Sequence, residues 1–202
     1  MDETTLSCLV GQVMERLFVE MEASGRHVHL TRQQIQTLFG HDLTPVKPLS
    51  QPGQFAAKER LDLIGPKGQL KNVAVLGPAR KEAQVEISLT DARGLGLTVP
   101  VRQSGHVSGS PGITLVGPAG TVAISQGVIA AQRHIHLTPA DACRFGVTDQ
   151  QTVKLQTFTS RPLVFEDVVV RVSPEFASRV HLDYDEANAC GFVPGDYGRI
   201  LP

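Results

Sequence analysis

Two copies of one six-residue pattern decide the fold: RHVHLT at residues 26–31 and RHIHLT at residues 133–138. The copies match at five of six positions. After each copy the sequence predicts a short helix, which is capped by the threonine and ends in Phe-Gly. Two copies so far apart are too few for a solenoid. The repeat therefore indicates two related halves, each of which contains one His-x-His strand.

Short strands separated by turns account for most of the remaining chain. Proline followed by glycine favours tight turns, because proline fixes φ and glycine tolerates positive φ. Two near copies, LIGPKG at 63–68 and LVGPAG at 115–120, are typical of hairpin tips. The runs with the composition of strands lie at residues 73–76, 84–87, 152–155 and 168–172. Frequent turns between short strands favour small barrels or sandwiches.

Residues 4–19 predict an amphipathic helix, because apolar side chains recur there at steps of three and four residues. Such a helix usually packs on its own domain. It could instead be a docking peptide for a partner, and Gly11 would suit a segment that becomes ordered only on binding. The residues alone leave both interpretations open.

The composition of the 202-residue chain excludes several classes of function. With 19 basic and 20 acidic residues the formal net charge is −1, so the chain lacks the basic field typical of nucleic-acid binding. No apolar run approaches the roughly 18 residues that cross a bilayer. The acidic start, with Asp2 and Glu3, is unlike a secretory signal. Three cysteines, Cys8, Cys143 and Cys190, form no CxxC pair, which fits a reducing cytosol.

The two His-x-His patterns are candidate metal sites. Residues i and i+2 of a strand point to the same face, so each pattern places two imidazoles side by side. Neutral imidazoles bind zinc and other transition metals. A single pattern would more often be a partly exposed strand, but its duplication in one sequence frame favours a metal. A third ligand is needed to leave one position open for chemistry, and His181 and Glu86 are the candidates.

Two further residues could lie near such a site, Arg80 and His106. Arg80 follows a Gly-Pro turn six residues before Glu86, and a guanidinium held there could bind phosphate or carboxylate. His106 lies in a Gly/Ser loop and could be close to the site or inert. His41, beside an aspartate, is expected to be solvated.

Taken together, these residues resemble the phosphotransacylases of bacterial microcompartments, the phosphate propanoyltransferase family. The resemblance covers nearly the whole chain, from about Ser24 to Gly191. The matching stretches are RHVHLT (26–31), KPLSQPGQFAAKE (47–59), LIGPKGQLKNV (63–73), LGPAR (76–80), QVEIS (84–88), TDARGLG (90–96), GSPGITLVGPAG (109–120), GVIAAQRHIHLTPADA (127–142), LVFEDVVVRVSPEF (163–176) and HLDYDEANACG (181–191).

The resemblance implies a mainly β fold, with two small β-barrel domains capped by short α-helices and an N-terminal amphipathic helix. In the family the N-terminal strand pairs with the second barrel, so the implied domains are discontinuous. Residues 1–19 form the amphipathic peptide, a candidate encapsulation peptide. Residues 25–132 form the first barrel, and residues 20–24 with 133–202 form the second.

The resemblance also implies two zinc ions per chain, at the interface of the barrels. Carried over by motif, the ligands of the first zinc are His27, His29 and Glu86, and those of the second are His134, His136 and His181. Arg80 matches the arginine that holds inorganic phosphate, and Ser104 matches a serine in a loop near the site, which makes both candidate catalytic residues. The positions that match contacts to coenzyme A are Ser24, Lys47, Leu76, His181 and Asn188.

Four positions depart from the family's pattern. Gly25 stands where asparagine is usual, and Tyr184 changes a run that usually reads His-Ile-Asp-Thr-Asp. His106 replaces an aspartate or asparagine, and Ala74 replaces a basic residue that precedes Leu-Gly-Pro. None of these changes removes a candidate metal ligand. They could alter the acyl preference or the affinity for coenzyme A.

The implied enzyme is a phosphate acyltransferase, which interconverts acyl-CoA and phosphate with acyl phosphate and coenzyme A by direct attack of phosphate on the thioester. The acyl group is expected to be propanoyl or acetyl. The alternatives are a dinuclear zinc hydrolase of thioesters or phosphoesters and a zinc-stabilised structural protein. The expected partners are these substrates, shell or core proteins reached through the N-terminal peptide, and a second copy in a homodimer, without nucleic acid or membrane. The expected location is the lumen of a bacterial microcompartment in the cytoplasm.

Overall fold

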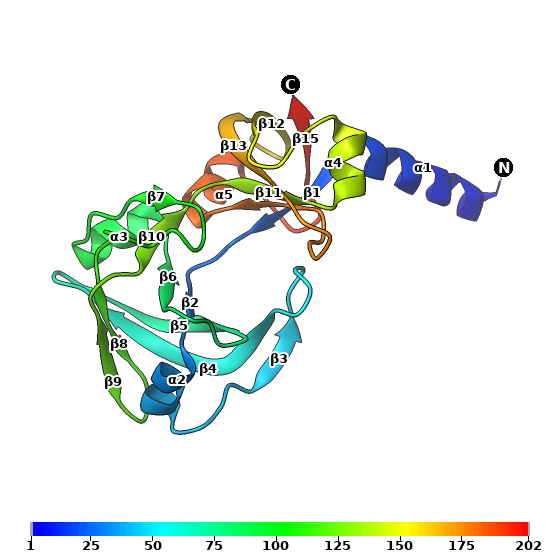
Figure 1. Ribbon diagram of the computed structural model, residues 1–202. Helices are drawn as coiled ribbons and strands as arrows, with labels where there is room; N and C mark the ends of the chain where they lie inside the picture. Colours follow the sequence, from blue (N-terminus) through cyan, green and yellow to red (C-terminus); the bar gives the residue numbers. More distant parts are fainter. Residues whose placement is uncertain (1, 202) are drawn as a thin grey trace. The chain divides into compact units, whose positions relative to one another are not determined.

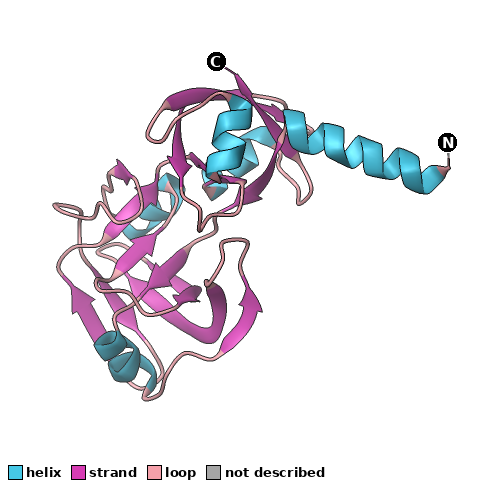
Figure 2. Cartoon of the chain, turned by 45° about the vertical axis from the view of Figure 1, so that its right-hand side comes forward, coloured by secondary structure: helices cyan, strands magenta, loops and turns pink. Residues whose placement is uncertain are grey.

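The computed structural model describes residues 2–201, which divide into two compact units. Unit 1 comprises the residues up to 23, 133–182 and those from 186 onward, and unit 2 comprises 24–132 and 183–185. Strands dominate both units, and the helices are few (Figures 1 and 2). None of the helices within residues 2–201 combines the length and hydrophobicity needed to cross a membrane.

Unit 1 is built on a closed six-stranded barrel with the strand order β1-β14-β11-β13-β12-β15. Its strands are β1 (Val19–Ala23), β11 (His134–Leu137), β12 (Thr152–Phe158), β13 (Val164–Val172), β14 (Arg179–Leu182) and β15 (Tyr197–Leu201). Its helices are α1 (Glu3–Leu17), α4 (Pro139–Phe145) and most of α5 (Tyr184–Cys190). Alternate strand residues fill the barrel, among them Ile135, Leu137, Val168, Val170, Val180 and Leu182. The residues between them face outward.

Unit 2 is a curved sheet with the order β7-β10-β6-β2-β5-β4-β8-β9, and β3 pairs with β4 beside this path. Its strands are β2 (His27–His29), β3 (Pro45–Pro48), β4 (Phe55–Ile64), β5 (Gln69–Gly77), β6 (Gln84–Glu86), β7 (Val101–Arg102), β8 (Ile113–Val116), β9 (Thr121–Ile124) and β10 (Val128–Ala131). Its helices are α2 (Arg32–Phe39) and α3 (Leu89–Leu95). The mainly β fold with short helices, predicted from the sequence, is confirmed by this half-barrel and the closed barrel of unit 1.

The two units repeat one arrangement of strands. In unit 2, β2 lies between β5, which is parallel to it, and β6, which is antiparallel. In unit 1, β11 lies in the same way between the parallel β13 and the antiparallel β14. A further parallel strand follows in each case, β10 beside β6 and β1 beside β14. Each His-x-His strand therefore occupies an equivalent place.

The chain changes unit immediately before each His-x-His strand. Strand β1 pairs in unit 1 with β14 and β15, and the next strand, β2, belongs to unit 2. Conversely, β10 pairs in unit 2 with β6 and β7, and the next strand, β11, belongs to unit 1. The strand that precedes each His-x-His strand in the sequence therefore belongs to the opposite unit: β1 to unit 1 and β10 to unit 2.

Local sequence signals account for the ends of several elements. The side chains of Thr31 and Thr138 cap α2 and α4 by accepting from Gln34 N and Asp141 N, and both helices end at a left-handed glycine. Both predicted hairpin tips are tight turns, in which Gly65 N donates to Gly68 O and Gly117 N to Gly120 O.

The N-terminal helix ends earlier than the predicted range of 4–19. Phe18 is already extended, with φ −133° and ψ 156°. Val19 begins strand β1, where it is 3% exposed and pairs with Gly198. Burial in the barrel and pairing with β15 therefore override the helical pattern at this point.

Candidate active site

The first candidate metal cluster lies on the outward face of two neighbouring strands of unit 2, β2 and β6. On β2, the Val28 side chain is buried in the core, which turns His27 and His29 to the other face. The antiparallel pairing with β6 places Glu86 directly opposite His27. The ligand atoms of His27, His29 and Glu86 all lie within 4.8 Å of one another, and all three residues are buried. The structure therefore brings the three predicted ligands together.

The atoms of this cluster fit a divalent metal. Nε2 of His27 lies 3.6 Å from Oε2 of Glu86. Two zinc ligands with bonds of about 2.0 Å in a tetrahedron are separated by roughly 3.3 Å. Nδ1 of His27 lies 2.7 Å from the Gly25 carbonyl oxygen, which leaves Nε2 for a metal. Nδ1 of His29 is buried without a hydrogen-bond partner. A bound metal would satisfy such a nitrogen.

The second cluster repeats this design in unit 1. His134 and His136 project outward from β11, and the antiparallel β14 places His181 directly opposite His134. The ligand atoms of the three histidines lie within 4.8 Å of one another. Both ring nitrogens of His136 are buried without a hydrogen-bond partner. In both units, the third candidate ligand thus lies on the strand antiparallel to the His-x-His strand, directly opposite the first histidine.

The electrostatics keep one histidine of each cluster neutral. Burial, followed by the charges of His27 and Arg80, lowers the pKa of His29 to about 2. Burial, followed by the charges of His134 and Arg171, lowers the pKa of His136 to about 3. Burial opposes the charged form of His27, but the adjacent Glu86 carboxylate outweighs it and raises the pKa of His27. Neutral imidazole is the form that binds metal, so the His29 and His136 rings are ready for binding at pH 7.

A hydrogen-bond network joins the first cluster to the candidate phosphate ligand. Gln84 is buried two residues before Glu86, and its Nε2 donates to Glu86 Oε1 over 2.5 Å and to Ser104 Oγ over 2.7 Å. Its Oε1 accepts from Gly105 N over 2.7 Å. Nη1 of Arg80 donates to Ser104 Oγ over 3.3 Å. Arg80 and Ser104, two predicted catalytic residues, are therefore in contact and connected through Gln84 to Glu86.

Sequence reasoning missed Gln84. Its place in the sequence could have indicated it, because residues 84 and 86 of one strand share a face and Gln84 therefore lies beside the candidate ligand Glu86. Its register opposite His29 became visible only from the pairing of β6 with β2.

The residues predicted to contact coenzyme A are distributed over both units. Unit 2 contains Ser24, in the segment between β1 and β2, Lys47 on the exposed strand β3, and Leu76 on β5. Unit 1 contains His181 on β14 and the exposed Asn188 on α5. Ser24, Leu76 and His181 are half-buried.

Gly25 and Tyr184, two of the predicted departures from the family's pattern, lie close together. A Cβ at Gly25 would collide with the Tyr184 ring, with a distance of 2.6 Å to its Cζ. An asparagine at position 25, which the family resemblance predicts, would therefore require a smaller residue than tyrosine at position 184. The change also bears on the first cluster, because the Gly25 carbonyl is the hydrogen-bond partner of His27. His106, another departure, is exposed in the loop after Gly105.

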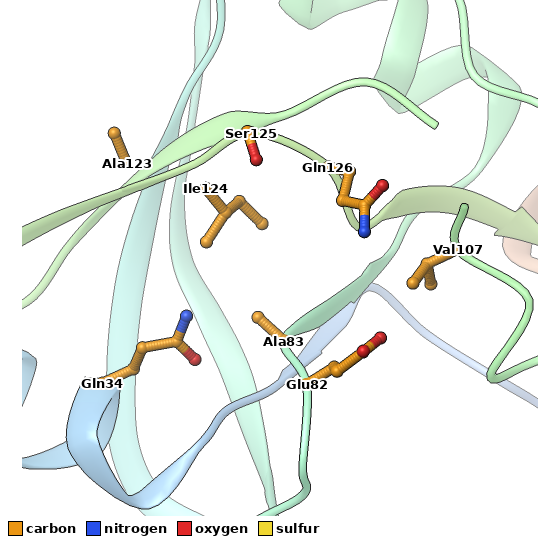
Figure 3. A pocket seen from close by; sticks show the side chains of 8 residues that line it. All are labelled: Gln34, Glu82, Ala83, Val107, Ala123, Ile124, Ser125 and Gln126. Carbon is orange, nitrogen blue, oxygen red and sulfur yellow. The ribbon is translucent and has the colours of Figure 1, made fainter. Parts of the chain in front are cut away.

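A pocket of about 330 Å³ opens elsewhere in unit 2 (Figure 3). It is lined by Gln34, Glu82, Ala83, Val107, Ala123, Ile124, Ser125 and Gln126. None of the predicted metal, phosphate or coenzyme A ligands lines it.

Comparison with known proteins identifies the family. The profile of the phosphate propanoyltransferase family matches residues 20–193. The chain belongs to this family. The phosphate propanoyltransferase of Enterococcus faecalis is 56% identical over 184 residues, which cover 90% of this chain and 87% of that protein. The one of Listeria monocytogenes is 49% identical over 100% of this chain and 97% of its own length. The one of Clostridioides difficile is 50% identical over 98% of each chain.

Membership of the phosphate propanoyltransferase family confirms the predicted class of enzyme, a phosphate acyltransferase. Acyl-CoA and phosphate fit this family as substrates. The two His-rich clusters thus belong to a phosphate acyltransferase, and their ligand atoms could each hold a metal ion.

Proposed function

We propose that this phosphotransacylase interconverts propanoyl-CoA and phosphate with propanoyl phosphate and coenzyme A, at two zinc sites. His27, His29 and Glu86 would hold one zinc, and His134, His136 and His181 the other. The observation that carries the proposal is the repeated geometry, in which a His-x-His strand faces a third ligand on its antiparallel neighbour. The relatives, which align over nearly their full length, carry the name phosphate propanoyltransferase and support this acyl group.

Three protein ligands per cluster would leave a bound zinc with a coordination position for a substrate atom. When bound, zinc supplies Lewis-acid stabilisation of the negative charge that develops on the thioester oxygen and on the departing thiolate. The role of the chain is to hold the ligands at fixed positions. The burial of Glu86 and His29 and the hydrogen bond of His27 to Gly25 serve this purpose.

Arg80 would hold the phosphate. Its guanidinium can form two parallel hydrogen bonds to phosphate oxygens, and the contact with Ser104 fixes its direction. Phosphate held in this way is oriented for attack, which can supply several kcal/mol of the activation free energy. One phosphate oxygen forms a bond to the acyl carbon as the carbon–sulfur bond breaks, and the electron pair of that bond leaves with the coenzyme A thiolate. No acyl-enzyme is formed in this scheme.

Ser24, Lys47, Leu76, His181 and Asn188 are the residues we propose for binding coenzyme A. Lys47 carries the charge suited to the phosphate groups of the cofactor, and its exposed position on β3 supports this role. Leu76 follows Val75, the pairing partner of Val28 in the sheet, and offers an apolar surface. Replacing Lys47 by glutamine should raise the KM for propanoyl-CoA and leave the KM for phosphate unchanged.

The test of the proposed function is the release of free thiol from propanoyl-CoA, with and without phosphate, before and after removal of metal by a chelator. Release that requires phosphate, disappears with the chelator and returns with zinc would support the transferase. Release without phosphate would instead identify a thioester hydrolase. A metal-containing protein that releases no thiol from propanoyl-, acetyl- or butanoyl-CoA would point to a structural role.

We further propose that α1 directs the enzyme into the lumen of a bacterial microcompartment. Its apolar side chains Leu6, Leu9, Val10, Val13 and Leu17 are about half exposed. A helix with such an uncovered stripe can dock in the apolar groove of a shell or core protein. A reporter fused to residues 1–17 should be enclosed in a host that forms compartments, and replacement of Leu6, Val10 and Val13 by serine should leave it outside. The homodimer that the family resemblance implies is a separate proposal, which light scattering would test.

A further inference from the structure

Arg171 lies beside the second metal cluster on the outward face of the unit 1 barrel. It is the pairing partner of His136 in the parallel register of β11 and β13. The neighbours of Arg171 along β13, Val170 and Val172, pack in or against the barrel core. The guanidinium therefore projects on the same side of the sheet as the three histidines.

Aromatic contacts hold the Arg171 side chain in a defined place. The centre of its guanidinium lies 5.7 Å from the centroid of the Phe176 ring. The same ring stacks on His136, with centroids 4.1 Å apart and planes inclined by 23°. Phe176 is thus a common platform for a metal ligand and a cation.

Arg171 is half-buried, yet within residues 2–201 no carboxylate forms an ion pair with it and no side chain accepts a hydrogen bond from it. Arg179, the antiparallel partner of His136 on the same sheet face, provides a contrast. Its guanidinium forms an ion pair with Glu20 over 2.9 Å. The other outward carboxylate of β1, Glu22, is opposite His181, and two strands separate β1 from β13.

The ligand set of the second cluster carries no negative charge. Three neutral imidazoles contribute no negative charge, whereas the first cluster contains the Glu86 carboxylate. A divalent metal at the second cluster would therefore stand beside the Arg171 cation without any compensating acidic ligand. The fold itself does not require the cation, because Leu76 occupies the equivalent position of unit 2, one residue beyond the pairing of Val28 with Val75.

We propose that Arg171 and the cluster of His134, His136 and His181 form a binding subsite for a phosphate group of a substrate. The inference rests on the proposed function, since it assigns a second anion ligand to the same reaction. A guanidinium presents a rigid pair of N–H donors that match two phosphate oxygens, and the Phe176 platform restricts its rotation. The phosphate group belongs either to inorganic phosphate and the acyl phosphate or to coenzyme A, and separate measurements distinguish these sources.

The experiment compares the Arg171→Gln and Arg171→Lys variants of the full chain with the wild type. The KM is measured for phosphate, for propanoyl-CoA and for 3′-dephospho-propanoyl-CoA. Equilibrium binding of inorganic phosphate to the zinc-loaded proteins gives a readout that does not depend on turnover. The zinc content of each variant is measured at the same time.

We expect Arg171→Gln to weaken binding of the relevant compound by about 10- to 100-fold, the usual effect of losing a charged hydrogen-bond donor. Arg171→Lys retains the charge without the paired donors and should show an intermediate loss. A higher KM and dissociation constant for phosphate alone would assign the subsite to inorganic phosphate. A higher KM for propanoyl-CoA that is absent with the dephospho analogue would assign it to coenzyme A.

Arg179→Gln is the matched control, because it removes the same charge from the same sheet face but from a residue already paired with Glu20. Unchanged phosphate and coenzyme A constants in Arg171→Gln, with full zinc content, would overturn the proposal. Loss of zinc from both Arg171 variants would overturn it as well, because Arg171 would then act in building the cluster. If the wild type itself shows no phosphate-dependent thiol release, the proposed function fails, which is a separate result.

Discussion

Replacement of Gln84 should weaken the first metal site and the phosphate site together. The Gln84 amide donates to the metal-ligand candidate Glu86 and to Ser104, and it accepts from the backbone of Gly105. Gln84→Leu has a similar volume but removes all three hydrogen bonds. Gln84→Glu preserves the shape and the acceptor for Gly105 N, but it places an oxygen where the Glu86 carboxylate requires a donor.

The size of the effect follows from the partners. Glu86 is 7% exposed, so water cannot readily replace the lost donor. A hydrogen bond to a charged group contributes about 1.5–3 kcal/mol. Loss of a residue that orients a metal ligand typically lowers metal affinity or activity by about 10- to 100-fold. We therefore expect zinc affinity at the first cluster to fall within that range in Gln84→Leu, and further in Gln84→Glu because two carboxylates would then face each other.

The assay is competition for zinc with a chromophoric chelator, which reports the affinity of each site, together with the visible spectrum of the cobalt-substituted protein. The KM for phosphate should rise in parallel, because Ser104 would no longer hold Arg80 in place. Gln126→Leu is the control, since Gln126 is an exposed glutamine of unit 2 that lines the separate pocket (Figure 3). Wild-type zinc affinity and wild-type phosphate KM in a folded Gln84→Leu variant would refute the reasoning.

Three further results follow from the structure. Arg80→Ala should raise the KM for phosphate by at least about tenfold and lower kcat, whereas unchanged phosphate kinetics would contradict its role. In the metal-free protein, burial holds the pKa of His29 near 2 and that of His136 near 3, against 6.5 ordinarily. The unfolded chain thus binds more protons below pH 6.5, and denaturant titrations should show the free energy of unfolding falling by about 1.4 kcal/mol per pH unit for each histidine as the pH decreases. A pH-independent value between 6.5 and 4.5 would exclude this. Gly117→Ala should destabilise unit 2 by about 1–3 kcal/mol in thermal unfolding, because the added Cβ would collide with the Leu38 backbone; an unchanged Tm would count against it.

The elements that the sequence predicts well are those with a local cause. The helices after each His-x-His strand begin at capping threonines and end at glycines with positive φ, and both signals are local in sequence. The hairpin tips at Gly65 and Gly117 are likewise closed by hydrogen bonds between residues three apart in the sequence. The alternation of strand side chains was enough to place His27 beside His29 and His134 beside His136.

The parts that the sequence does not predict depend on long-range pairing. Nothing local indicates that Glu86 faces His27 or that His181 faces His134, because these registers are set by strands far apart in the chain. The same is true of Gln84 and Arg171, which became visible as parts of the two sites only through their pairing partners. Family resemblance assigned the third ligands, since periodicity alone left both candidates open for either pair.

Strand β1 limits how far the chain can be truncated from its N-terminus. Val19 and Met21 are 3% and 2% exposed, and β1 closes the barrel between β14 and β15. A truncation after Leu17 would remove only a helix, whereas one that extends to Ala23 would leave two open sheet edges, which are sites of aggregation. The helix for which we propose a targeting role is therefore separated from a strand of the barrel by one residue, Phe18. Residues 1–17 can be exchanged without removing a strand, but the cut must fall before Val19.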